Sequence, residues 1–106
     1  YMEAKEWEIL LDKLKQNDSH FNKLNLRNQP IDIQRMKELA SVLQSNSKLI
    51  QLELYHNKLT VEAIQWLATA IERSSVLEEL KISSNSLNSE SMKWLARALE
   101  KNIKLK

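Results

Sequence analysis

Hydrophobic positions along this chain follow a pattern that recurs every 28 residues. Three segments, residues 21–31, 49–59 and 77–87, carry apolar residues with one shared spacing and an Asn or Gln at one shared position. Spaced leucines with a fixed period of this length are typical of repeat architectures. The pattern predicts one structural unit used three times, and arrays of such units usually present a surface to another protein.

Within each unit the hydrophobic period changes from two to about 3.6 residues. The alternating part, residues 23–27, 51–55 and 79–83, predicts short strands, and the part that follows predicts helices. The apolar helix positions are Met36, Leu39, Ala40 and Leu43; Ile64, Leu67, Ala68 and Ile71; and Met92, Leu95, Ala96 and Leu99. Asp32, Thr60 and Asn88 precede these helices as expected N-caps. Strands separated by helices must be parallel.

The units resemble leucine-rich repeats of the ribonuclease-inhibitor-like class over residues 21–105. The resemblance implies an α/β fold, a right-handed horseshoe with a short parallel sheet on its concave face and helices on its convex face. The expected repeats are 21–48, 49–76 and 77–104, with a fourth truncated at Leu105, so we expect a piece of a larger protein. Gln29 replaces the usual Asn of this class, and the chain contains no glycine.

Residues 1–18 form a separate segment ahead of the array of residues 19–106. Trp7, Leu10, Leu11 and Leu14 occupy one helical stripe. An open end of a repeat array needs covering, which favours a capping helix or the helix of a preceding repeat. A helix that binds a partner is the alternative.

Composition removes several classes of function. The 106 residues include 16 basic and 14 acidic side chains, a net charge of +2 that gives no strong reason to expect nucleic acid or a membrane surface. Apolar runs are too short to span a membrane. Cysteine is absent, which suits a reducing compartment and predicts a cytoplasmic protein, in the host cytoplasm if it is a bacterial effector.

Catalytic and metal chemistry have little support in the sequence. His20 precedes the first strand and His56 ends the second, so the two histidines are not expected to share a site. Without cysteine they match no zinc pattern, and without glycine no phosphate-binding loop is present. We therefore expect no enzyme, no metal and no cofactor.

The outward positions of the strands are the main candidates for partner binding. Side chains that alternate away from the core should form rows across the sheet, Asn25 with Glu53 and Lys81, and Arg27 with Tyr55 and Ser83. Tyr and Arg are enriched in binding hot spots, so the predicted partner-binding residues are Asn25, Arg27, Glu53, Tyr55, His56 and Lys81. The alternative is a solvated spacer in which Glu53 and Lys81 form a weak ion pair.

Two tryptophans predict a second surface. Trp66 and its equivalent one unit later, Trp94, lie far from the apolar stripe of their helices and should face outward. Each indole can pack over a neighbouring helix, or the pair can form an exposed patch on the convex face for a protein or another copy of the chain. The strand edge near Leu80 and Ile82 is a second candidate for self-association.

Three functions remain. The leading hypothesis is a protein-protein interaction module or scaffold, within a bacterial effector or an innate-immune-type protein. The second is an accessory or substrate-recognition domain of an enzyme whose catalytic part lies outside this chain. The third, activation of a bound GTPase of the Ran type through Arg27 or Asn25, has no matching motif.

Overall fold

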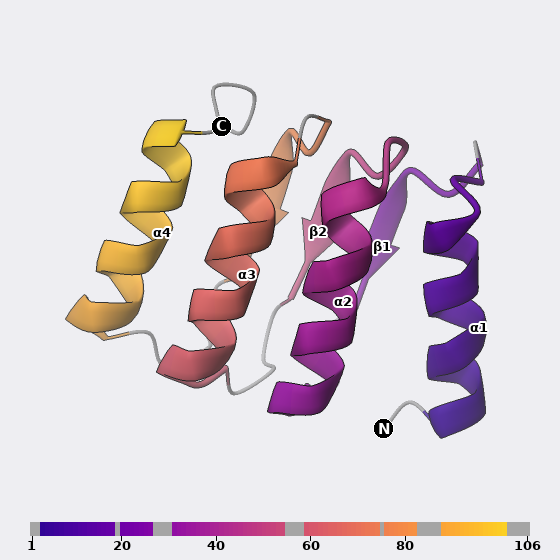
Figure 1. The fold of residues 1–106 in the computed structure, drawn as a ribbon, viewed down its shortest axis with the longest axis horizontal. Helices are drawn as coiled ribbons and strands as arrows, with labels where there is room; N and C mark the ends of the chain where they lie inside the picture. The colour runs from indigo at the N-terminus through magenta and orange to yellow at the C-terminus, as the bar shows by residue number, and fades with distance from the viewer. Residues whose placement is uncertain are drawn as a thin grey trace.

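Helices and strands alternate along the chain. The computed structural model describes residues 3–18, 20–26, 31–54, 59–74, 76–82 and 88–101. Within these residues the elements are α1 (Ala4–Lys15), β1 (Lys23–Asn25), α2 (Ile33–Ser45), β2 (Gln51–Glu53), α3 (Val61–Arg73), β3 (Glu79–Lys81) and α4 (Ser89–Lys101). The helices lie side by side in one layer, and the strands form a second layer behind them (Figure 1).

The start of each of the last three helices is fixed by a side chain. Asp32 Oδ1 accepts a hydrogen bond from the backbone N–H of Arg35 at 2.8 Å, and Thr60 Oγ1 accepts one from Ala63 at 3.2 Å. Asn88 Oδ1 does the same for the third following residue at 2.9 Å. The three predicted N-caps are confirmed. Different residues at one pattern position therefore accept a hydrogen bond from the equivalent backbone amide in the first turn of each helix.

The sheet is parallel, with the strand order β1-β2-β3. Leu24 faces Leu52, which in turn faces Leu80, so every facing pair is 28 residues apart. Backbone bonds continue past the strand ends: the N–H of Leu26 donates to the carbonyl oxygen of Glu53 at 2.9 Å. The predicted parallel pairing is confirmed.

One continuous apolar core lies between the two layers. Its fully buried side chains come from strand, helix and linking positions, and include Leu14, Leu26, Met36, Leu39, Leu49, Leu52, Leu54, Ile64, Leu67, Ile71 and Leu77. The stripe predicted on α1 is buried as well, from Trp7 to Leu14. Arg35 of α2 lies over the Trp7 ring, with Cζ 5.2 Å from the ring centroid, so α1 is held on α2 by aromatic as well as aliphatic contacts.

The apolar stripe predicted on the last helix is only partly buried. Leu95 is in the core, but Met92 and Leu99 are 52% and 47% exposed, and Ala96 is exposed too. The prediction is wrong for these three residues. Helix α4 packs on α3 alone among the described elements, so the side that a further element would cover faces solvent.

The predicted horseshoe solenoid is also wrong. Curvature in a repeat protein accumulates from a small rotation at each unit, and three strands of three residues are too few to build an arc. The described chain measures 34 × 30 × 18 Å, a two-layer domain of four helices over a small three-stranded parallel sheet. It therefore offers two broad faces, a sheet face and a helix face, rather than a concave and a convex side.

Candidate functional site

The sheet face consists of the side chains that alternate away from the core on the three strands. The register places them in two rows across the sheet, Lys23 with Gln51 and Glu79, and Asn25 with Glu53 and Lys81. Strand alternation is the cause, because residues between the buried leucines must point to the other side. The second row is the one predicted from the sequence.

Glu53 is held by its neighbours on this face. Gln51 Nε2 donates a hydrogen bond to Glu53 Oε1 at 2.7 Å, and Lys81 Nζ lies 3.6 Å from the same oxygen. The predicted ion pair is therefore present, with the Lys81 side chain 38% and the Glu53 side chain 15% exposed. The centre of the sheet face is therefore polar, and the charges of Glu53 and Lys81 there are paired with each other.

The other predicted residues of the sheet face are not covered by the structure. Arg27, Tyr55 and His56 lie outside the described residues, as does Ser83. The structure thus brings Asn25, Glu53 and Lys81 together, and their role in binding stays a prediction.

A second candidate surface lies on the helix face, and we call it the Trp face: Lys37, Trp66, Lys93, Trp94 and Arg97. Trp66 is 40% exposed, as its outward position predicts. Its ring reaches the neighbouring helix α2, where Lys37 Nζ lies 5.4 Å from the ring centroid. A cation over an indole is favourable and orders both side chains.

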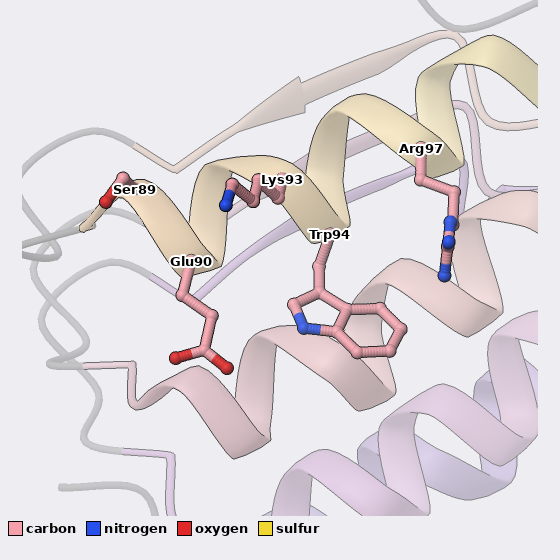
Figure 2. Close-up of a pocket in the computed structure, with 5 residues that line it drawn as sticks. All are labelled: Ser89, Glu90, Lys93, Trp94 and Arg97. Carbon is pink, nitrogen blue, oxygen red and sulfur yellow. The ribbon is translucent and has the colours of Figure 1, made fainter.

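Trp94 forms the deeper part of the Trp face. Its ring is half-buried and packs on the apolar core, and Arg97 Cζ lies 5.6 Å from the ring centroid. A shallow depression of about 500 Å³ is lined here by Ser89, Glu90, Lys93, Trp94 and Arg97. Figure 2 shows the Trp94 and Arg97 side chains extending from α4 on the same side, toward α3.

The cationic partners of the two indoles were not predicted from the sequence. One signal was available for Arg97, which follows Trp94 by three residues and so lies on the same side of the helix. Lys37 belongs to a different helix from Trp66 and becomes a neighbour only through packing of α2 on α3.

The described part of the chain holds neither a candidate metal site nor a membrane-spanning helix. Residues 3–18, 20–26, 31–54, 59–74, 76–82 and 88–101 contain no group of three or more His, Asp or Glu side chains able to hold a metal ion. None of the helices in these ranges is both long enough and apolar enough to cross a membrane.

Comparison with known proteins identifies the fold. No protein-family model matches this chain, and no curated protein matches it in sequence. Solved structures do match the fold. Among them are the tropomodulin C-terminal domain of Caenorhabditis elegans, 20% identical over 93% of this chain with a TM-score of 0.82, and actin-binding site 2 of leiomodin-1, 18% identical over 100% of it with a TM-score of 0.87. The chain has the fold of these two domains.

These matches correct the interpretation of the sequence. The described chain has the fold of the tropomodulin and leiomodin-1 domains, a small helical domain with a short parallel sheet, and not that of a leucine-rich repeat solenoid. Neither neighbour is a bacterial effector or an innate-immune receptor, so that setting has no support. The chain spans about 60% of the length of each solved domain, and at these identities the likeness establishes the fold alone.

Proposed function

We propose that this chain is a protein-binding domain and that actin is the partner to test first. One observation carries the proposal: the whole chain superposes on actin-binding site 2 of leiomodin-1 with a TM-score of 0.87. The proposed activity is binding without a catalytic step. Actin as partner would agree with the cytoplasmic location expected from a cysteine-free chain.

The Trp face is the contact surface that we favour. Trp and Arg contribute most often to binding hot spots, and here an exposed Trp66 and a half-buried Trp94 lie on adjacent helices. The cations Lys37 and Arg97 border the two rings, and Lys93 lines the depression beside Trp94. This arrangement suits a partner surface with an apolar centre and acidic residues around it. On the sheet face, by comparison, Glu53 is already engaged by Gln51 and Lys81.

The test is co-sedimentation with actin filaments and capture of monomeric actin. We expect the wild-type chain to bind one of these forms and the Trp66→Ala/Trp94→Ala variant to bind at least about tenfold more weakly, because truncation of a hot-spot residue costs about 2 kcal/mol or more. Asn25→Ala/Lys81→Ala is the matched control on the sheet face and should bind like the wild type.

Each other outcome has a defined meaning. Absence of binding by the wild-type chain in both assays would exclude actin. A loss confined to Asn25→Ala/Lys81→Ala would move the site to the sheet face. Trp66→Phe, which keeps an aromatic ring, and thermal unfolding of every variant separate lost contacts from lost folding.

A further inference from the structure

Helix α4 carries opposite charges on the two sides of Trp94. Glu90 precedes the indole by four residues and Arg97 follows it by three, so the three side chains lie on one side of the helix. Figure 2 shows all three extending from this side. We call these three residues the α4 line. Along the helix it runs from a carboxylate through an indole to a guanidinium.

The charged ends of the α4 line are accessible to a partner. Glu90 and Arg97 are exposed, and both line the depression around the half-buried Trp94. Within the described residues neither of them forms an ion pair with the rest of the domain. Lys93 lies outside the α4 line, and its long side chain can keep the ammonium in water. The carboxylate and the guanidinium can therefore pair across an interface.

The α4 line is complementary to a second copy of itself that runs antiparallel. At about 1.5 Å per residue, Glu90 lies about 6 Å before Trp94 along the helix axis, and Arg97 lies about 4.5 Å after it. A two-fold axis between two Trp94 rings places each Glu90 opposite the partner's Arg97, with an offset of only about 1.5 Å along the helix. A parallel arrangement would instead bring like charges together. The charge pattern thus selects both the second copy and its orientation.

The surface around the α4 line has no net charge. Four positions of α2, α3 and α4 make up this surface: the position of the indole and those four before, one before and three after it. Its charged residues are three cations and three carboxylates, Lys37, Lys93 and Arg97, and Glu38, Glu62 and Glu90. Repulsion between net charges therefore does not oppose the approach of a second copy. Trp66, 40% exposed on the adjacent helix, adds apolar area to the same surface.

We propose that the Trp face binds a second copy of this chain in an antiparallel, two-fold symmetric dimer. Each contact then occurs twice, with the indoles at the centre and Glu90 against the partner's Arg97 on both sides. The dimer follows from residues of this chain alone. It covers the surface proposed for actin, so competition between actin and the second copy rests on that proposed function.

Sedimentation equilibrium of the whole 106-residue chain measures the self-association. We expect a monomer–dimer equilibrium for the wild type. Glu90→Arg and Arg97→Glu should each weaken the dimer at least about tenfold, because one substitution puts two like-charged pairs into a symmetric interface. Glu8→Arg, which reverses an exposed charge on α1, is the matched control and should dimerise like the wild type.

Two results of this measurement would overturn the proposal. One is a wild-type chain that stays monomeric at every concentration up to about 1 mM. The other is dimerisation of Glu90→Arg and Arg97→Glu that is as strong as that of Glu8→Arg, which would place the interface elsewhere. Circular dichroism of each variant shows that the domain is folded.

A mixture of the two single variants tests the orientation. In a heterodimer of Glu90→Arg with Arg97→Glu, two positive groups on one copy face two negative groups on the other. The equimolar mixture should therefore dimerise at least about tenfold more tightly than either variant alone. Glu90→Arg/Arg97→Glu exchanges both charges within one chain and should recover the dimer as well. A mixture that dimerises no better than its components would contradict the antiparallel pairing.

The dimer and the binding of actin fail separately. A chain that dimerises but does not bind actin keeps the dimer and excludes actin, and a monomeric chain that binds actin does the reverse. If both hold, saturating actin should dissociate the dimer. A complex of actin with the intact dimer would contradict the assignment of the dimer to the Trp face.

Discussion

At the scale of single residues, the Asn46 side chain forms hydrogen bonds to two segments that lie far apart in the sequence. This side chain is buried, with Nδ2 donating to the carbonyl oxygen of Leu14 at 2.9 Å. Its Oδ1 accepts from the backbone of Lys48 at 3.0 Å and of Leu49 at 2.7 Å. One amide thus joins the end of α1 to the segment between α2 and β2.

We predict that Asn46→Ala lowers the free energy of unfolding by about 2 to 3 kcal/mol, because it leaves several backbone groups without their partner. Asn46→Ser should cost less, since Ser74 at the equivalent place in the next unit accepts one such bond, from Leu77 at 3.1 Å. Urea unfolding measures both. Asn22→Ala, at an exposed position, is the control, and an Asn46→Ala effect no larger than the control would contradict the prediction.

At the scale of elements, the helices depend on caps of different chemistry. The Thr60 side chain bonds the first turn of α3, whereas Glu3 before α1 makes no side-chain cap bond. We predict that Thr60→Ala destabilises the domain by about 1 kcal/mol and that Thr60→Ser, which keeps the hydroxyl, changes stability by a few tenths. Thermal unfolding measures the difference. Equal melting temperatures for the two variants would show that the cap contributes nothing.

At the scale of the whole molecule, the position of a helix within the helix layer determines how much its apolar side chains contribute to stability. Met36 and Met92 hold the same pattern position two units apart, yet Met36 is 0% exposed and Met92 is 52% exposed. We predict a loss of about 2 to 5 kcal/mol for Met36→Ala and less than about 0.5 kcal/mol for Met92→Ala. Chemical denaturation of the two variants provides the comparison. Similar losses would mean that α4 is covered by another part of the molecule.

Much of the local structure could be predicted from the sequence, because caps and register follow from short-range rules. Asp32, Thr60 and Asn88 stand directly before a helical pattern and bond as expected. The alternation around Leu24 and Leu52 fixes which side chains face the core, so one row of the sheet face, from Asn25 to Lys81, follows as well.

The shape and the surroundings of individual side chains could not be predicted in this way. A repeated pattern shows that Met92 is suited to a core position, but it does not show whether another element lies against it. Likewise, the contact of Lys37 with Trp66 arises between helices, where side-chain direction and helix packing decide the distance. The horseshoe interpretation was wrong for a related reason, since a shared hydrophobic pattern does not determine the curvature of the helix and strand layers.

The absence of glycine also has a consequence for the unfolded chain. Helices α2 and α3 are followed by C-cap residues with extended backbone, Asn46 and Ser74. In the described segments, Asn17 is the one non-glycine residue with positive φ, at 54°. A chain of 106 residues without glycine has fewer backbone conformations to lose on folding, and each glycine replaced at a compatible position is worth about 0.4 to 1 kcal/mol. Part of the stability of this small domain therefore comes from the restricted freedom of the denatured ensemble rather than from any contact in the folded state.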